Sequence, residues 1–427
     1  MERQKLETIL RDQKQEFETL LSGKWCRRKE ESLVNLNSRL AQVVIGVRRS
    51  GKSTLCVNLI KAAEEKFAYL NFEDENLTDF KAEDLNMALE CLYQIYGDFN
   101  HLFLDEIQNV DGWQHFVNRL LRGGMHILMT GSNAKLLSSE LATHMTGRYV
   151  PIELYPFSFA EYCEAKELPT SHGTTKEKGL LRGAFDEYMK DGGFPELMGE
   201  NRKEAYIDEL ISGILKNDIE KRYGIRYTAS FERMAHHLMN IAPVKINNAD
   251  LSEEFGFKSS HTADNYVEYL ERAYLLCMVS KHSYKSQIRV HNKKAYPVDI
   301  ALMNRRKDAF AGENLGWRLE TVVLIELLRR YRSQGMDIAY LQERNGECDF
   351  LVCRGRNTEL AVQVSYDISK ESTFKREIKG LMIASEKTGC RNLLLITDYE
   401  ERTIQKNGLT IKIVPAYSWL VDSRETV

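Results

Sequence analysis

The sequence predicts an α/β fold built on a parallel sheet, and three observations support this fold class. Between residues 41 and 157, short apolar runs alternate with helical patterns, which is typical of a parallel sheet with helices on both faces. The first run leads into GVRRSGKST at residues 46–54, which fits the phosphate-binding pattern Gly-x-x-x-x-Gly-Lys-[Ser/Thr]. A later run ends in Asp105 and Glu106. Ligands of such sheets bind at the carboxyl ends of the strands, where both motifs lie.

The composition is that of a globular chain with several domains. The chain has 427 residues, of which 43% are hydrophobic and 28% charged, and this balance excludes a disordered protein. Its net charge of −3 means that any contact with nucleic acid needs a local basic patch. The 8 cysteines form no Cys-x-x-Cys pair and indicate reduced thiols of a cytoplasmic protein. No apolar run approaches the ~20 residues of a membrane span, so no membrane partner is expected.

We expect residues 1–40 to form a polar helical arm packed against the sheet. Leu6, Ile9, Leu10 and Phe17 recur at roughly helical spacing. The cations at residues 25–29 have two readings, contact with phosphate or a solvated charged face, and the second is favoured. Five strands then follow at residues 43–46, 67–72, 102–105, 127–130 and 149–154.

The loop after the first strand predicts a binding site for nucleotide phosphates. Successive backbone N–H groups in such a loop converge on an anion, and the next helix aims its positive dipole end at the same place. A side chain at either loop glycine would keep the backbone from approaching the phosphates. Lys52 would reach the β- and γ-phosphates, and Ser53 would hold Mg²⁺. The predicted nucleotide-binding residues are Gly46, Val47, Arg48, Arg49, Ser50, Gly51, Lys52, Ser53 and Thr54.

The acids after the third strand favour an ATPase over a kinase. In the phosphoryl-transfer template, Asp105 holds Mg²⁺ through water, while Glu106 orients and deprotonates an attacking water. A kinase has no use for a water-activating acid at this position. The alternative is a strand that ends in an ordinary charged turn.

Two further groups are candidates for sensing the nucleotide and completing the site. Thr130, Ser132 and Asn133 follow the fourth strand, where a polar side chain can bond the γ-phosphate or the attacking water; a helix cap is an equal alternative for the last two. Arg148, before the fifth strand, is the candidate for a catalytic arginine that reaches a γ-phosphate, in its own chain or in a neighbour. A structural ion pair is the competing reading for Arg148, and the two loop arginines are weaker candidates.

Motifs in a fixed order extend the phosphate loop into a recognisable series. They are Tyr-Leu-Asn-Phe-Glu-Asp at 69–74, Leu-Asp-Glu-Ile-Gln at 104–108, Thr-Gly-Ser-Asn at 130–133, Gly-Arg at 147–148 followed by Glu-Leu-Tyr-Pro-Phe-Ser-Phe at 153–159, and Asp-Gly-Gly-Phe-Pro-Glu at 191–196. From about residue 40 to 420, the chain resembles the bacterial and archaeal AAA-type ATPases that carry a C-terminal domain of unknown function. The resemblance implies an AAA-like P-loop core, a helical lid, a winged-helix segment and a restriction-endonuclease-like α/β C-terminal domain.

The expected domains follow from the patterns and the resemblance together. They are an N-terminal helical arm at 1–40, the AAA-like core at 41–157, the helical lid at 158–228, a winged-helix-like domain at 229–300 and the restriction-endonuclease-like domain at 301–427. By resemblance, Lys216, Asp218 and Arg222 of the lid would approach nucleotide. Their spacing alone favours a solvated helix face.

Residues 229–300 read as short helices followed by strands, the order of a winged helix. The expected recognition helix carries Asp264, Glu268 and Glu271, which a DNA phosphate would repel. Residues 281–294, by contrast, hold cations and no acid, and cations on phosphates release counterions. This segment is the predicted nucleic-acid patch, with protein docking or a bare solvated wing as alternatives. Its members are Lys281, Lys285, Arg289, Lys293 and Lys294.

By resemblance, metal-dependent cleavage in the C-terminal fold needs carboxylates from its first helix and second strand, then an acid-x-Lys on the third. Glu320 and Asp349 stand at the first two positions. The third reads Gln363-Val-Ser365, with an amide for the acid and a hydroxyl for the lysine. We therefore expect a vestigial nuclease site, because a weaker metal site without its cation stabilises a developing phosphorane poorly.

The sequence therefore predicts a cytoplasmic ATPase that binds ATP and Mg²⁺ and acts as a nucleotide-driven switch, with coupling to DNA left open. One alternative is an ATP-gated nuclease. The other is an ATP-binding signalling or scaffold module with a protein partner or self-association.

Overall fold

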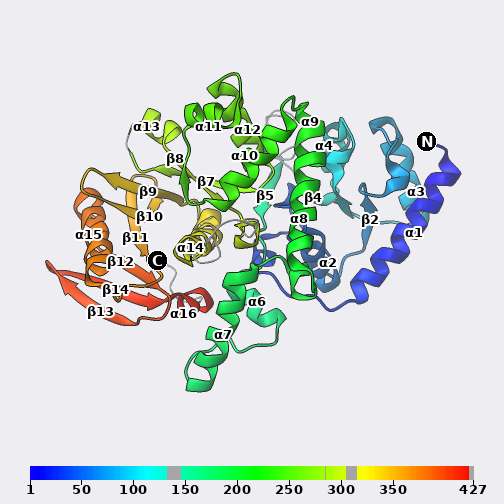
Figure 1. The fold of residues 1–427 in the computed structure, drawn as a ribbon. Helices are drawn as coiled ribbons and strands as arrows, with labels where there is room; N and C mark the ends of the chain where they lie inside the picture. Colours follow the sequence, from blue (N-terminus) through cyan, green and yellow to red (C-terminus); the bar gives the residue numbers. More distant parts are fainter. Residues whose placement is uncertain (132–144, 146, 284, 304–314, 423–427) are drawn as a thin grey trace. The chain divides into compact units, whose positions relative to one another are not determined.

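The structure is a computed structural model that describes residues 1–131, 145, 147–283, 285–303 and 315–422. Its chain forms two compact units, Met1–Leu154 and Tyr155–Val427 (Figure 1). Within the described residues, no helix is both long and apolar enough to cross a membrane.

The first unit is built on a five-stranded sheet in the order β2-β3-β4-β1-β5, with every neighbouring pair parallel. The strands are β1 Ala41–Ile45, β2 Phe67–Asn71, β3 His101–Asp105, β4 His126–Gly131 and β5 Tyr149–Glu153. All five residues of β1 and of β3 are buried, as expected for strands covered on both faces. The parallel five-stranded core predicted from the sequence is confirmed.

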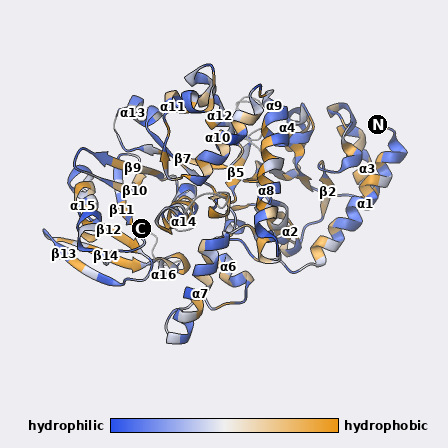
Figure 2. Ribbon diagram, in the orientation of Figure 1, coloured by the Kyte–Doolittle hydropathy of each residue, from blue (hydrophilic) through white to orange (hydrophobic). Residues whose placement is uncertain are grey.

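Four helices of this unit are α1 Arg3–Ser22, α2 Lys52–Ala62, α3 Leu85–Tyr96 and α4 Trp113–Arg122. Short helical turns lie between them at η1 Lys29–Leu33, η2 Glu75–Leu77, η3 Ala82–Asp84 and η4 Ile107–Asn109. Helix α1 is mostly hydrophilic in Figure 2, and its few apolar residues face the core. Phe17 of α1 stacks on Tyr69 of β2 with ring centroids 4.4 Å apart. The N-terminal helix therefore packs on the sheet.

Gln13 of α1 also satisfies the open edge of the sheet. Its Nε2 donates to the carbonyl oxygen of Asn71 at 3.0 Å, and its Oε1 accepts from the N–H of Asn71 at 3.0 Å. One amide side chain thus replaces the peptide that a further strand would present to β2. Edge strands with free N–H and C=O groups invite pairing with other chains, and this contact closes one such position.

The second unit contains a mixed nine-stranded sheet in the order β13-β14-β12-β11-β10-β9-β7-β8-β6. Its strands are β6 Val244–Lys245, β7 Leu276–Lys281, β8 Lys293–Pro297, β9 Asp337–Glu343, β10 Gly346–Arg354, β11 Asn357–Val364, β12 Leu393–Thr397, β13 Arg402–Lys406 and β14 Leu409–Pro415. β7 pairs with β9 in parallel, Ser280 opposite Ala339. The boundary expected at residue 300 therefore falls within one continuous sheet, and the domain limits themselves stay a prediction.

The helices of this unit are α6 Phe159–Ala165, α7 Thr175–Asp191, α8 Lys203–Gly213, α9 Lys221–Tyr223, α10 Thr228–Asn240, α11 Asn248–Phe255, α12 Ser260–Arg272, α13 Ser286–His291, α14 Leu315–Tyr331, α15 Glu371–Thr388 and α16 Ala416–Val421. Between α8 and α9, residues Ile214–Glu220 form a π-helical segment. Short 3₁₀ turns are η5 Pro195–Met198, η7 Ile300–Met303 and η9 Arg332–Gln334.

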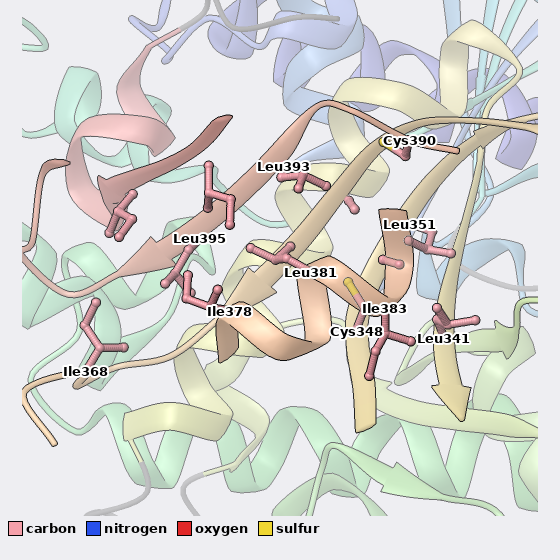
Figure 3. Packing of buried hydrophobic residues seen from close by; sticks show 14 of the residues in the cluster. Leu341, Cys348, Leu351, Ile368, Ile378, Leu381, Ile383, Cys390, Leu393 and Leu395 are labelled. Carbon is pink, nitrogen blue, oxygen red and sulfur yellow. The ribbon is translucent and has the colours of Figure 1, made fainter. Parts of the chain in front are cut away.

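Helix α15 covers one face of the C-terminal strands with an apolar stripe. Figure 3 shows Ile378 and Leu381 of this helix over Leu351, Leu393 and Leu395 of the sheet, all in one buried cluster. Every residue of β12 is buried, and the strand is correspondingly hydrophobic in Figure 2. Helix α14 contacts β10 and β11 as well, and it lies on the other side of these strands in Figure 1.

The Asp-Gly-Gly motif at residues 191–193 joins the end of α7 to the turn after β8. The N–H of Gly193 donates to Oδ2 of Asp299 at 2.9 Å, and a Cβ on Gly192 would lie 2.1 Å from Oδ1 of the same carboxylate. Arg318 of α14 donates to the carbonyl oxygens of Met189 and Lys190, at 2.6 and 2.7 Å, and so satisfies the last turn of α7. The motif is thus explained by packing within this unit.

Candidate active site

The phosphate loop lies between β1 and α2, at the carboxyl edge of the first sheet. Helix α2 begins at Lys52, and its N-cap Gly51 is left-handed with φ of 93°. Gly46 has φ of 153°, and a Cβ at this position would lie 2.1 Å from the carbonyl oxygen of Leu154. We expected glycine at position 46 because a side chain would keep the backbone from the phosphates. In the structure, a side chain at this position would first collide with the backbone of Leu154, directly after β5.

Lys52 joins the loop to Glu106, the acid directly after β3. Its side chain is 5% exposed, and Nζ donates to the carbonyl oxygen of Val47 at 3.1 Å. The same Nζ lies 3.9 Å from Oε1 of Glu106. The predicted phosphate-binding lysine and the predicted water-activating acid are therefore neighbours. Outside this pair, Arg48 of the loop forms an ion pair with Glu73.

The two predicted metal ligands lie side by side. Ser53 donates from its hydroxyl to Oδ1 of Asp105 at 3.0 Å. Hydroxyl and carboxylate oxygens are the hard ligands that Mg²⁺ takes, usually with only one or two carboxylates and the substrate phosphates. Among the described residues, no group of three His, Cys, Asp or Glu could hold a metal by itself. Ser53 and Asp105 therefore fit as ligands of a Mg²⁺ ion that nucleotide phosphates would also bind.

Thr130, near the end of β4, binds both Asp105, the last residue of β3, and Glu106, which follows it. Its hydroxyl donates to Oδ1 of Asp105 and accepts from the backbone N–H of Glu106 at 3.1 Å. Of the three predicted sensor residues, Thr130 therefore reaches the site, whereas Ser132 and Asn133 lie outside the described residues. Glu106 itself is left-handed with φ of 52°, a strained conformation for a residue other than glycine and one that is common at active sites.

The electrostatics of Asp105 follow from its position. Burial, with the negative charge of Glu106 as a second cause, raises the pKa of Asp105 to about 6, against the hydrogen bonds from Thr130 and Ser53 and the charge of Lys52. Without a bound cation, the ionised form of Asp105 therefore lowers the stability of the folded chain. A divalent metal would relieve that cost.

Two residues of this site were missed by the sequence reasoning. Gln108 donates from Nε2 to Oε2 of Glu106 and so holds the carboxylate. Arg28 was expected on a solvated face, but it is buried, and its Nη1 donates to the carbonyl oxygen of Ser50 in the loop at 2.9 Å. The position of Gln108 two residues after Glu106 offered a signal. Nothing local distinguished Arg28 from its charged neighbours.

Arg148 lies at the amino ends of the parallel strands, whereas the phosphate loop lies at their carboxyl ends. It precedes β5, which runs parallel to β1 with Tyr149 opposite Ala41 at the start of that strand. Five residues of strand, about 16 Å, separate the amino ends from the carboxyl ends. The Nη1 of Arg148 donates to Oδ1 of Asn118 at 3.1 Å. The structure therefore does not bring Arg148 to the phosphate loop of its own chain.

The C-terminal unit gathers the acids of the predicted vestigial site. Glu320 of α14 accepts from the Tyr296 hydroxyl at 2.8 Å, and Oδ2 of Asp349 accepts from the Val364 N–H at 2.8 Å. Burial is the main cause that raises the pKa of both carboxyl groups, and the positive charge of Lys294 opposes it. The two acids of the predicted pattern are thus buried and close enough to interact.

Lys294 belongs to this acid cluster and not to the predicted nucleic-acid patch. Its side chain is 7% exposed, and Nζ lies 3.8 Å from Oε1 of Glu347. Burial alone would lower the pKa of Lys294, but the charges of Glu320, Asp349 and Glu347 raise it. The assignment of Lys294 to the patch was therefore wrong. A buried lysine cannot release counterions from DNA.

At the third position of the nuclease pattern, Gln363 and Ser365 form hydrogen bonds with other groups of the chain. Gln363 donates from Nε2 to Oε2 of Glu377 at 2.7 Å, and its Oε1 accepts from the Asp349 N–H at 3.3 Å. Ser365 donates to the carbonyl oxygen of Asp367 at 3.2 Å. Gln363 therefore joins the acid cluster as a hydrogen-bonding group, while Ser365 bonds the following turn.

The remaining members of the patch are accessible. Lys285 and Arg289 are exposed, and Lys281 and Lys293 are half-buried. They lie on β7, α13 and β8 and on the residue before α13, after the helices α10, α11 and α12. Their contact with nucleic acid stays a prediction, as does the winged-helix assignment.

Comparison with known proteins supports the reading of the first unit. Residues 38–163 match a family described as an AAA domain, and residues 182–312 match a domain of unknown function, DUF8612. The chain is 35% identical over 393 residues to the uncharacterized protein MJ1544 of Methanocaldococcus jannaschii, covering 88% of this chain and 87% of that protein. It is 33% identical over 396 residues to an uncharacterized protein of Haemophilus influenzae, covering 89% and 94%.

Among solved structures, the Walker-type ATPase paby2304 of Pyrococcus abyssi is similar with a TM-score of 0.37 and 15% identity, covering 66% of this chain and 98% of that one. At this TM-score the likeness carries no argument about function.

Proposed function

The chain belongs to the family of these two uncharacterized proteins from Methanocaldococcus jannaschii and Haemophilus influenzae, and on this premise we propose that it binds ATP with Mg²⁺ and hydrolyses it to drive a conformational switch. The AAA domain at residues 38–163 is a P-loop domain and implies nucleotide binding. The observation that carries the proposal is the hydrogen bond from Ser53 to Asp105, which joins the loop to the acidic end of β3.

In the proposed reaction, the chain binds the nucleotide and handles one proton. Lys52 and the loop N–H groups would balance the phosphate charge, while Ser53 and Asp105 would hold the metal. Bound Mg²⁺ would supply further positive charge to the β- and γ-phosphates. Glu106 accepts a proton from water as the water oxygen bonds the γ-phosphorus and the bond to ADP breaks, which leaves ADP and phosphate. Gln108 holds the carboxylate that takes the proton.

The arginine of the site is proposed to come from a neighbouring copy. Arg148 lies about 16 Å from the carboxyl edge of its own sheet, counted as five residues of strand. A guanidinium on that edge can serve the nucleotide of another chain in an assembly. This proposal requires self-association.

The other modules are proposed to respond to the nucleotide state. The proposed domains are the arm at 1–40, the core at 41–157, the lid at 158–228, a winged-helix-like domain at 229–300 and a restriction-endonuclease-like domain at 301–427, with DNA as the candidate partner. An active nuclease has less support, because the amide Gln363 stands where the pattern has an acid and is hydrogen-bonded to Glu377. The proposed location is cytoplasmic, as the cysteine usage of the sequence indicates.

The test of the ATPase is the hydrolysis rate of the full chain and of three variants. Lys52→Ala should lose both binding and hydrolysis, whereas Glu106→Gln should bind ATP and lose hydrolysis by at least ~10²-fold. Glu83→Gln, an exposed acid of the same unit, is the matched control and should keep the wild-type rate. Turnover that survives Glu106→Gln would remove Glu106 from the mechanism, and a wild-type rate equal to that of Lys52→Ala would remove the ATPase.

A further inference from the structure

The segment between α1 and β1 contacts the phosphate loop from outside. Arg28 in this segment is buried, and its Nη1 donates to the carbonyl oxygen of Ser50 at 2.9 Å. Ser50 is the residue before Gly51, whose peptide opens the N-terminus of α2. A buried, charged hydrogen bond to a backbone carbonyl is among the stronger contacts available to a loop.

This contact also fixes where an N–H group of the loop points. The peptide between Ser50 and Gly51 is planar and trans, so its C=O and N–H point in opposite directions. With the Ser50 oxygen held toward Arg28, the Gly51 N–H points away from Arg28. A cation on the oxygen further polarises that N–H as a donor. Arg28 thus acts on a backbone group of the predicted phosphate cradle.

The segment is anchored on α2 independently of the Arg28 side chain. Asn58 donates from Nδ2 to the Cys26 carbonyl oxygen and to Oε1 of Glu31, both at 3.1 Å. Lys61 donates to the Gly23 carbonyl oxygen at 2.8 Å. Because these contacts hold the main chain of the segment on α2, loss of the Arg28 side chain should leave the segment in place.

We infer that Arg28 is a positioning residue for nucleotide binding, which holds the Ser50–Gly51 peptide with its N–H directed to the phosphates. This inference rests on the proposed function. It assigns an energetic role in phosphate binding to the N-terminal segment outside the loop motif. The loop is then organised before the nucleotide arrives, and less ordering is required on binding.

The test compares Arg28→Met with Arg27→Met in the full chain. Arg27 is the exposed neighbour and serves as the matched control. For Arg28→Met, the dissociation constants of Mg-ATP and Mg-ADP should both rise by about 10- to 100-fold, the usual effect of losing a charge-assisted hydrogen bond. The rate at saturating ATP should change much less. Arg28→Lys, which keeps a charge and a donor, should recover part of the affinity, and Arg27→Met should bind as the wild type does.

Thermal unfolding without nucleotide separates this role from a purely structural one. If Arg28→Met unfolds earlier but its folded fraction binds both nucleotides as tightly as the wild type, the inference is overturned while the ATPase stands. If the wild type binds ATP without hydrolysing it, the ATPase fails, and the dissociation constants still decide the role of Arg28. A wild-type chain that binds no nucleotide overturns both.

Discussion

Gln13 binds both the N–H and the C=O of Asn71, each at 3.0 Å, so a helix side chain occupies the place of a neighbouring strand. We expect Gln13→Ala to lower the free energy of unfolding by about 1–3 kcal/mol, because it leaves the partly buried N–H and C=O of Asn71 without this partner. Urea unfolding of the full chain measures the change. Gln15→Ala, exposed on the same helix, should change the stability by less than ~0.5 kcal/mol, and equal effects of the two variants would contradict the edge-closing role.

Asp105 should reduce the stability of the nucleotide-free chain. Burial raises the pKa of Asp105 to about 6 from 3.8, so the folded chain binds more protons than the unfolded chain between these values. Stability therefore falls as pH rises through this window, and the loss remains at neutral pH. Asp105→Asn should raise the free energy of unfolding at pH 7.5 by about 1–3 kcal/mol, with little change near pH 4.

Urea unfolding at the two pH values checks this expectation for Asp105, with exposed Asp79→Asn as the control. The same Asp105→Asn variant should lose Mg²⁺-dependent hydrolysis. A variant that is more stable but inactive is the expected result when a destabilising residue is kept because the activity requires it. Equal effects of Asp105→Asn at both pH values would show that the charge is not the cause.

Lys294 should be required by the acids that surround it. Lys294→Met leaves Glu320 and Asp349 buried without their cation, and removal of one partner from a buried charge cluster costs about 3–5 kcal/mol. Unfolding at pH 7.5 should show this loss, and unfolding at pH 5 should show less, since raised carboxyl pKa values favour protonation there. Lys293→Met, its half-buried neighbour, should have little effect. A similar loss for both variants would contradict the cluster.

Arg148 should act between copies. Arg148→Ala keeps a complete phosphate loop, and Lys52→Ala keeps a complete Arg148, so each variant alone should be inactive by about 10³-fold or more if the arginine serves a neighbour. A mixture of the two should recover part of the wild-type hydrolysis rate. An unchanged rate for Arg148→Ala alone would leave Arg148 with a structural role, to which its hydrogen bond to Asn118 belongs.

The accessible part of the basic patch should carry any response to DNA. Duplex and single-stranded DNA should stimulate hydrolysis. The stimulation should be weaker at the higher of two salt concentrations, because phosphate contacts release counterions. Neutralising Lys281, Lys285, Arg289 and Lys293 together should abolish it. Neutralising the exposed Lys176 and Lys178 of α7 should not. A rate indifferent to DNA would favour a protein partner.

The nucleotide motifs were readable from sequence because each is local. A loop of nine residues and an apolar run ending in two acids place Lys52, Ser53 and Asp105 at the carboxyl edge of any parallel sheet. The same reasoning argues against Arg148, since a residue before a parallel strand lies at the amino edge. Its distance from the loop was therefore predictable from the order of residue and strand.

The environments of Lys294 and Arg28 could be predicted from the sequence to different degrees. Successive side chains of a strand point to opposite faces, so Lys293 and Lys294 could not share one surface of β8. That alternation was a usable signal. Arg28 gave no comparable signal, because its partner is a backbone carbonyl 22 residues away in the chain.

The pairing of β7 with β9 has a consequence for ancestry. Recombination at residue 300 would separate the two strands and leave each half with an open edge that invites aggregation. The stretch from β6 to β14 should therefore have been inherited as one piece, and relatives that gain or lose modules should do so outside it.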